Sequence, residues 1–508
     1  MYTIRFPLGM NPQQRSVADK RFFHLFRIHN QIIKRAIKLM NILNNSPEYR
    51  ALKRQYALDL ASESEKKVTI SQMNQFRKEI GLTKHGLESY IKVMGHSVRR
   101  FVSSNQVQKE ADRIWSSVEK MLFGDGKKIH FKKLADIRSI SSKNMNGCVY
   151  TDPFHPDGRK TARPAVFPYQ IDWLGMILKV KVDEKDPYVR IALGLDSAAP
   201  VDIRYCEIVR LMFNSGWRYY VNLVIRGDPP QKTALGQDIV GIDPGVSTVA
   251  YASDNALGLE ELAPRCHQYT REIRLLQNRM EKSRRITNPD NYNTDGTVKK
   301  GKKKWNLSHN YCRMKRKLQT QFRKKSAYTR SKHSELANRI MEIAGTIIIE
   351  PNRFSKMTKK EPAEREKKES PLEKKGRIFM IQKYKKTRRF GRSINNRSPG
   401  LFVSILKNKI LSHGGEWYEI DPFIVKASQY CHDTGQCHKI PLSQRRKMIS
   451  GSMVLRDLYS AFIIRNTDPQ TNITNAQGCS NKFSHFLWLQ AQLINRIQPL
   501  PHPACFGI

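Results

Sequence analysis

"IVGIDPGVSTVAYAS", residues 239–253, places one carboxylate, Asp243, at the end of an apolar run and follows it at once with Pro244. The run has the length and composition of a buried strand, and proline cannot donate a hydrogen bond to a neighbouring strand. "VAYAS" then predicts a second strand that pairs with the first. Taken singly, such an acid is also explained by a purely structural role, in which it caps its strand or pairs with a lysine. Its meaning depends on whether other acids join it.

Two further acids occupy comparable positions. Glu350 ends the apolar run "TIIIE", and Asp457 lies in "LRDLYSAFII". If the strands that end at Asp243 and at Glu350 are parallel neighbours, these two acids meet at the carboxyl edge of a sheet, where open α/β sheets bind ligands. Asp457 lies off the apolar stripe of a predicted helix, beside Ser460 and Ala461, and small residues let a helix approach a sheet closely. The three carboxylates are therefore predicted to face one point.

Three converging carboxylates repel one another and need cations between them. Oxygen ligands favour Mg²⁺, or Mn²⁺ in its place, and two such ions can activate water and stabilise the leaving oxygen in phosphodiester hydrolysis. We therefore predict that Asp243, Glu350 and Asp457 are catalytic residues that hold two ions. Asp421 in "EIDPF" and Asp433 are the next candidates if Asp457 is not the third acid.

The composition predicts a polyanionic partner. The 508 residues include 90 Lys and Arg against 45 Asp and Glu, a formal net charge of +45. A charge of this size favours nucleic acid, although a basic surface can also simply be solvated. No apolar run is long enough to span a membrane, and the first residues, "MYTIRFPLGM", lack the apolar stretch of a signal peptide. We expect a cytoplasmic protein, acting at the bacterial nucleoid, with its eight scattered cysteines as free thiols.

The organisation changes along the chain. Apolar residues at helical spacing follow a first strand, and period-two alternation then appears in "GMILKVKV", "YVRIALGL", "CEIVRLMF" and "WRYYVNLVIRG". Beyond a linker at 227–238, strands alternate with helices, which indicates a sheet flanked by helices. The predicted fold is multidomain, α+β followed by α/β. The predicted segments are a first strand at 1–10, a helical domain at 11–126, a β-barrel at 127–235, a sheet domain at 236–425 with a basic helical insertion at 265–344, an insert at 426–453, and a last helix and tail at 454–508.

The order "GIDPG", "IIIEP" and "RDLYSAFII" resembles the three-part RuvC nuclease core of the RNase H fold. With the preceding helical and barrel domains, the whole chain is similar to the TnpB nucleases of insertion sequences and to compact type V CRISPR effectors. The resemblance implies that 11–126 is a recognition domain, 127–235 a wedge domain and 426–453 a target-nucleic-acid-binding insert. It also implies an endodeoxyribonuclease that uses a guide RNA to cleave double-stranded target DNA beside a short recognition motif, and it matches Asp243, Glu350 and Asp457 to the metal-binding triad.

The sequence departs from this family in places. Pro351 follows the central Glu where the family has an acid, and "DLYSA" stands where it has Asp-x-Asn-Ala-Ala. The family's insert often binds zinc through two Cys-x-x-Cys pairs, whereas this chain offers only Cys431 and Cys437, each followed by a histidine. Adjacent Cys-His pairs are poor tetrahedral chelators, so we expect no zinc.

Basic residues interleaved with aromatics are the candidates for nucleic-acid contact, because lysine and arginine bind phosphates and aromatic rings stack on bases. Each such segment is also typical of a solvated basic face. The candidates are Arg99, Arg100, Lys383, Tyr384, Lys385, Lys386, Arg388, Arg389 and Phe390.

Other functions stay open at this point. An RNA-guided DNA-binding repressor that does not cleave would use the same machinery, although such a protein would be expected to have lost one of the three acids. A guide-independent resolvase of the RuvC type would not need the 235 residues upstream. An actin-like ATPase would need a second glycine-rich phosphate loop, which the sequence lacks. The sequence leaves open the guide RNA, the recognition motif, and whether the protein is a monomer or a dimer.

Overall fold

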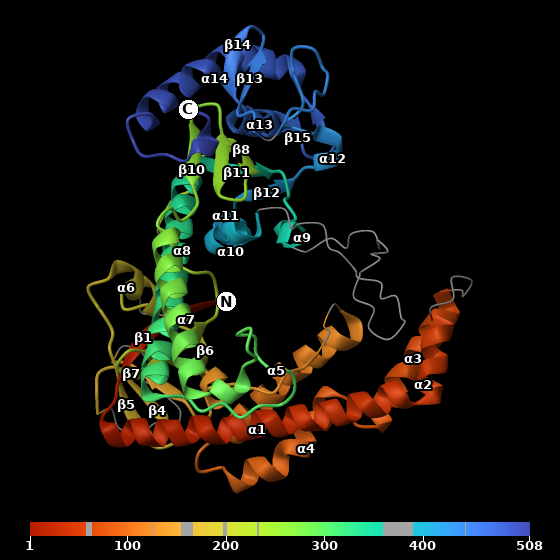
Figure 1. Cartoon of the computed structure of the whole chain (residues 1–508), viewed down its shortest axis with the longest axis vertical. Helices are drawn as coiled ribbons and strands as arrows, with labels where there is room; N and C mark the ends of the chain where they lie inside the picture. The colour runs from red at the N-terminus through yellow and green to blue at the C-terminus, as the bar shows by residue number, and fades with distance from the viewer. Residues whose placement is uncertain are drawn as a thin grey trace. The chain divides into compact units, whose positions relative to one another are not determined.

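The computed structural model forms two compact units, Met1–Pro230 and Gln231–Ile508. Their boundary lies within the linker expected at 227–238, and Figure 1 follows the chain from red to blue through both. Every helix in the described part of the chain is too short or too polar to cross a lipid bilayer. The structure describes residues 1–56, 63–124, 126, 128–153, 166–196, 201–230, 233–358, 390–441 and 443–508.

The first unit begins with a strand and continues with helices. The side chain of Asn11 and that of Gln14 cap the first long helix reciprocally, and a proline at its first position suits the missing N–H donor. Its apolar residues recur at helical spacing and are buried. The elements are β1 (Tyr2–Gly9), α1 (Pro12–Asn45), α2 (Pro47–Tyr56), α3 (Glu63–Glu79), α4 (Lys84–Ser97) and α5 (Ser104–Phe123).

Seven strands of the first unit form one antiparallel sheet with the order β2-β6-β7-β1-β5-β4-β3. β1 pairs with β7 over most of its length and with β5 at its end, so the start of the chain lies in the middle of the sheet. The sheet curls, and no ladder among the described residues joins its ends, β2 and β3. The added elements are η1 (Leu134–Asp136), β2 (Ser139–Ser141), β3 (Val149–Thr151), β4 (Gln170–Trp173), β5 (Met176–Val180), β6 (Ile203–Phe213) and β7 (Gly216–Ile225).

The strand predicted from "YVRIALGL" is wrong, because this segment forms the short helix α6 (Pro187–Leu193). Asp186 caps its start by accepting a hydrogen bond from the backbone of Tyr188, and Pro187 occupies the first helical position. Gly194 ends it in the left-handed conformation, with φ of 62°. The short apolar pattern fits a helix as well as a strand, and the capping residues on both sides favour the helix.

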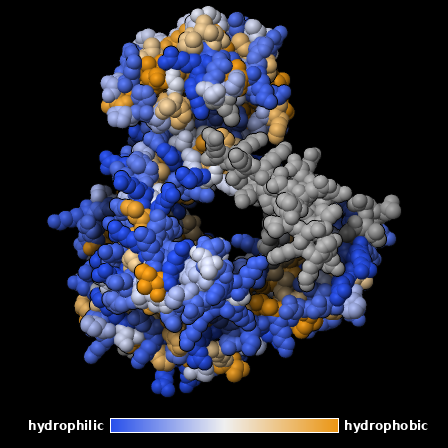
Figure 2. Space-filling view, viewed as in Figure 1, coloured by the Kyte–Doolittle hydropathy of each residue, from blue (hydrophilic) through white to orange (hydrophobic). Residues whose placement is uncertain are grey.

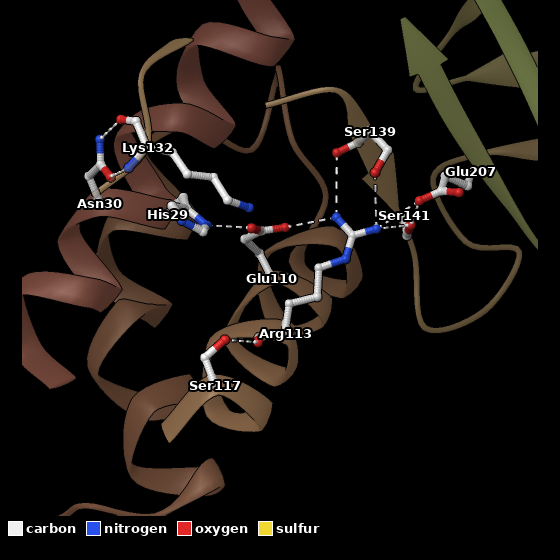
Figure 3. Close-up of polar contacts among 9 residues, drawn as sticks. All are labelled: His29, Asn30, Glu110, Arg113, Ser117, Lys132, Ser139, Ser141 and Glu207. Carbon is white, nitrogen blue, oxygen red and sulfur yellow. Dashed lines mark hydrogen bonds and ion pairs between the residues drawn. The ribbon is translucent and has the colours of Figure 1, made fainter. Parts of the chain in front are cut away.

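A buried polar network connects the helices of this unit to its sheet (Figure 3). His29 Nδ1 on α1 lies 2.6 Å from Glu110 Oε1 on α5, and both side chains are almost fully buried. Arg113, one turn further along α5, contacts Glu110 Oε2 at 3.1 Å and reaches Glu207 Oε1 on β6 at 2.7 Å. The Ser141 hydroxyl also donates to Glu207. A continuous series of polar side-chain contacts thus links α1 through α5 to β6 of the sheet.

The sheet of the second unit has the order β10-β9-β8-β11-β12. The first three strands in the sequence, β8, β9 and β10, form an antiparallel meander. β11 then pairs with β8 in parallel, and β12 pairs with β11 in parallel. The parallel pairing of the strands that carry Asp243 and Glu350 is therefore confirmed. The strands are β8 (Asp238–Pro244), β9 (Thr248–Ala252), β10 (Leu257–Glu261), β11 (Ala344–Ile349) and β12 (Glu416–Glu419).

Helices cover both faces of this sheet (Figure 1). One face buries Val240 and Ile242 of β8 against α8 (His309–Met341) and α11 (Pro399–Ser412). The other buries Ala250 and Ala252 of β9 with α13 (Arg456–Arg465) and α14 (Ala476–Ile497). Because side chains alternate along a strand, Gly241 and Asp243 point to this second face. α13, which carries Asp457, therefore lies on the face to which Asp243 points.

The remaining elements lie around this core. α7 (Cys266–Thr287) and α8 lie side by side, and the basic segment between them contains η2 (Pro289–Asn291). Asn288 anchors that segment, because its side chain exchanges hydrogen bonds with the backbone of Asn306. On the face shown in Figure 2, hydrophilic residues predominate. The other elements are α9 (Phe354–Thr358), α10 (Gly391–Arg397), α12 (Pro422–Val425), β13 (Arg446–Ile449), β14 (Ser452–Leu455), β15 (Thr467–Asp468), β16 (Ile473–Thr474) and η3 (Ala504–Phe506).

Candidate active site

The three predicted acids line one cavity of about 670 Å³ in the second unit. Asp243 is the penultimate residue of β8, Glu350 directly follows β11, and Asp457 is in the first turn of α13. Parallel pairing brings the carboxyl ends of β8 and β11 to the same edge, and the backbone N–H of Glu350 donates to Ile242 O at 3.3 Å. The three acids predicted from the sequence therefore line the same cavity.

The electrostatics of Asp243 and Glu350 indicate a shortage of positive charge beside them. Burial, followed by the charges of Asp457 and Glu350, raises the pKa of Asp243 well above its usual range. Burial also raises the pKa of Glu350. Both side chains keep some exposure, so they are open to the cavity rather than sealed in the core. Two carboxylates that resist ionisation are suited to a cation that would neutralise them.

Asp457 has different surroundings, because two arginines neutralise it. Arg456, the residue before it, approaches Asp457 Oδ1 with Nη2 at 3.0 Å and Nε at 3.2 Å. Arg445 Nη1 lies 3.5 Å from Oδ2 of the same carboxylate. The alternatives Asp421 and Asp433 do not line the cavity: Asp421 caps α12, and Asp433 is exposed. Asp457 therefore remains the third acid of the site.

The oxygen atoms of the cavity fit a hard divalent cation in their chemistry, but the three acids are not spaced to bind one ion together. Ser460 of α13 is fully buried and close enough to Asp243 to favour its charged form, yet its hydroxyl has no hydrogen-bond partner of ordinary geometry among the described residues. Carboxylate and hydroxyl oxygens are suitable ligands for Mg²⁺ or Mn²⁺. In the described part of the chain, however, no three His, Cys, Asp or Glu side chains are gathered closely enough to hold an ion as they stand. Asp243 and Glu350 would hold the cation, and Asp457 would have to leave its arginines to join them.

Several other residues of the cavity were missed by the sequence analysis. Lys439, Arg445 and Arg456 all line it, so three basic side chains accompany the three acids. Asn352 donates from its side chain to Pro244 O at 2.8 Å, which joins the segments after β8 and β11. The adjacency of Arg456 to Asp457 was the only sequence signal for this arrangement, and no spacing rule predicts contacts between a loop and a helix start.

The predicted nucleic-acid contacts are only partly placed by the structure. Arg99 and Arg100 are exposed in the turn between α4 and α5. Phe390, beside the start of α10, lines the cavity that holds the three acids rather than an open basic surface. The remaining candidates lie outside the described residues: Lys383, Tyr384, Lys385, Lys386, Arg388 and Arg389.

The two Cys-His pairs lie in different surroundings. Cys431 and His432 are buried, and His432 Nδ1 lies 2.8 Å from the hydroxyl of Tyr459. Cys437 and His438 are exposed. Among the residues that the structure describes, no three His, Cys, Asp or Glu side chains are close enough to hold a metal ion. These four side chains do not gather around one point, and the expected lack of zinc stays a prediction.

Comparisons with known proteins give one kind of match. No protein-family model and no curated protein sequence matches the chain. One similar solved structure is the cryo-EM structure of the Cas12f1-sgRNA-target DNA complex, at 12% identity and a TM-score of 0.46, covering 89% of this chain and 83% of that one. Another is a CRISPR-Cas12f ternary complex, at 14% identity and a TM-score of 0.24, covering 92% and 99%. Both of these solved structures are complexes of Cas12f proteins.

Proposed function

We propose that this chain is an RNA-guided DNA endonuclease whose reaction depends on a divalent cation. The observation that carries the proposal is the cavity in which Asp243, Glu350 and Asp457 converge from two parallel strands and a helix. Three acids in a partly open cavity with three basic neighbours suit a cation and a phosphodiester together. Neither a structural core nor a nucleotide-binding loop needs this combination.

We assign the sheet and helices of the second unit to a RuvC core of the RNase H type. Three antiparallel strands followed by two parallel ones, with the order β10-β9-β8-β11-β12, support this assignment. The helix with the third acid lies against the same face of the sheet as Asp243, which supports it further. We assign the curled sheet and helices of the first unit to the wedge and recognition parts of such an effector.

In the proposed reaction each side chain has a separate task. Asp243 and Glu350 would hold Mg²⁺ or Mn²⁺, and Asp457 would complete the ligand set. The bound cations supply activation of the attacking water and stabilisation of the leaving oxygen. Lys439 and Arg445, both at the cavity wall, attract the phosphodiester and orient it. Asn352 maintains the spacing of the two segments that carry the first two acids.

The proposed partners are a guide RNA and a double-stranded target DNA. A formal net charge of +45 needs many phosphates for neutralisation, and base pairing to a guide would supply the sequence specificity that a basic surface lacks. We expect the affinity for RNA to fall steeply as salt rises, because each phosphate contact releases counterions. Sequencing of the RNA that copurifies with the protein identifies the guide.

The test is cleavage of a guide-matched DNA by the RNA-loaded chain, with Mg²⁺ and with chelator. Asp243→Ala, Glu350→Ala and Asp457→Ala should each abolish cleavage while DNA binding persists, and the double variant of the first two should lose no more than either single one. Asp433→Ala is the matched control, because this acid is exposed and outside the cavity. Normal cleavage by Asp457→Ala would remove the third acid from the site.

An RNA-guided DNA-binding protein without cleavage is the second candidate. The ion pairs of Asp457 with Arg445 and Arg456 favour it, because the two arginines neutralise this acid in place of a metal ion. Specific binding of guide-matched DNA with no cut strand, under every divalent cation tried, would support this candidate over the nuclease.

A further inference from the structure

The two arginines on Asp457 differ in how firmly the chain holds them. The side chain of Arg456 is 9% exposed, and its Nη1 also approaches Gln444 O at 3.3 Å. The side chain of Arg445 is 31% exposed and lies at the cavity wall. Its guanidinium makes one ion pair among the described residues, with Asp457 Oδ2 at 3.5 Å. Arg456 is therefore fixed in the fold, whereas Arg445 is free to exchange its partner.

Arg445 and a divalent cation would compete for the same carboxylate. Asp243 and Glu350 have no ion pair with Lys, Arg or His within the described residues, so the only acid of the site with a bound guanidinium is Asp457. A cation shared by all three acids needs the oxygen that faces Arg445, and it is repelled by that guanidinium. A phosphodiester entering the cavity offers Arg445 a second anion, with the geometry that guanidinium groups bind best.

We propose that Arg445 is a positioning residue that holds Asp457 away from the cation and releases it when a phosphodiester arrives. The release joins two events: Arg445 moves to the phosphate, and Asp457 becomes available as a ligand. The site would then assemble fully only with nucleic acid in place, which limits cleavage without a bound target. This inference rests on the proposed function, because it assumes that the cavity takes a cation and a phosphodiester.

The first experiment measures Mn²⁺ binding by the full chain, freed of nucleic acid and kept at elevated salt, by isothermal titration calorimetry. Arg445→Gln should bind Mn²⁺ about three- to tenfold more tightly than the wild type, because a competing charge is removed. Arg445→Lys should restore the wild-type affinity. The matched control is Arg339→Gln, which removes an exposed arginine that lies 3.2 Å from Glu260, away from the cavity, and should change nothing.

A second measurement uses the RNA-loaded chain and a guide-matched DNA. Arg445→Gln should reach half-maximal cleavage at a lower Mg²⁺ concentration, yet its KM for DNA should rise because a phosphate contact is lost. A purely structural role for Arg445 would weaken both metal binding and stability instead. Unchanged or weaker Mn²⁺ binding by Arg445→Gln, with a wild type that binds Mn²⁺ and cuts, would overturn this inference alone. A wild type that neither binds Mn²⁺ nor cuts would overturn the proposed function with it.

Discussion

Gly241 on β8 lies directly against the backbone of α13, so that a Cβ added at this position would be 2.3 Å from the carbonyl oxygen of Ala461. The same Cβ would meet the backbone of Arg465, one turn further along. Gly241 and Asp243 point to the same face of the sheet, and Asp457 lies in the first turn of the helix that packs against Gly241. The missing side chain of one glycine thus determines how closely the first and third acids approach each other.

Replacing Gly241 by alanine should therefore damage both stability and cleavage. The added Cβ would contact backbone atoms that cannot rotate away, and overpacking of this kind costs on the order of 3 kcal/mol. α13 would have to shift, and Asp457 with it, so cleavage should fall at least about 100-fold even where the chain stays folded. Chemical denaturation and cleavage assays check the two effects.

Gly391→Ala is the control for that substitution. Gly391 begins α10, and an added Cβ there would meet no atom of the described residues within 4 Å. We expect it to be neutral or slightly stabilising, because alanine restricts the unfolded chain more than glycine does. Wild-type stability and cleavage in Gly241→Ala would contradict the close contact between β8 and α13.

The raised pKa of Asp243 predicts that this acid destabilises the metal-free protein at neutral pH. A carboxyl group whose pKa is raised on folding favours the folded state below its unfolded pKa, and that advantage is lost as the pH rises through the folded pKa. Asp243→Asn should therefore melt at a higher temperature than the wild type at pH 8 in chelator, by roughly 2 °C or more. The difference should shrink as the pH falls from 8, because a growing share of the wild-type carboxyl is then protonated.

Mg²⁺ should reverse that order. The cation binds the folded wild type through its carboxylates and should stabilise it, whereas Asp243→Asn should respond weakly. Thermal melting across pH 5–8, with and without Mg²⁺, measures both effects, and cleavage by the same variant should be absent. A wild type that is more stable than Asp243→Asn in chelator at pH 8 would contradict the electrostatic account.

The sequence predicted the acids of the site because each one follows a local pattern. Asp243 and Glu350 end apolar runs before a proline, and parallel strands end at one edge of a sheet, so their meeting follows from a pairing rule. Asp457 was located by its place off a helical stripe beside Ser460 and Ala461. The structure adds that the backbone of Ala461 lies against a glycine, Gly241, which the sequence alone did not single out.

The unpredicted features depend on contacts between distant segments. The pairing of Arg445 with Asp457 requires the loop before β13 to fold back onto the start of α13, which no periodicity encodes. α6 was mistaken for a strand because its seven residues fit both periods, and only the flanking Asp186 and Gly194 distinguish them. His29 and Glu110 are 81 residues apart and lie on two different helices, so no local pattern links them.

The two cysteines of the insert should differ in their response to substitution. Cys437 is exposed, so Cys437→Ser should change stability by less than about 0.5 kcal/mol. Cys431 belongs to the apolar core of the second unit, where a serine hydroxyl without a partner costs about 1–3 kcal/mol. Metal analysis of the wild type accompanies the denaturation curves. Stoichiometric zinc, with a large and equal loss of stability in both variants, would contradict our expectation that the insert binds none.

The network of Figure 3 yields the last prediction, because Glu110 holds a negative charge between two basic groups. Burial alone would raise its pKa, but the hydrogen bond with His29 and the charge of Arg113 lower it below the usual value. A depressed carboxyl pKa contributes stability above the unfolded pKa and loses it as the pH falls through the folded pKa. Glu110→Gln should therefore destabilise the chain at pH 7 by on the order of 3 kcal/mol, since Arg113 loses one of its two carboxylate partners and a buried charged network is broken. The deficit should narrow as the pH falls through the lowered pKa of Glu110, because the wild-type carboxyl then also becomes neutral. Glu119→Gln on the same helix is the control, because Glu119 is exposed and its glutamine can still accept from Trp115. Denaturant unfolding from pH 7 to pH 3 measures all three proteins, and equal stability of Glu110→Gln and the wild type at pH 7 would show that the network contributes nothing to the fold.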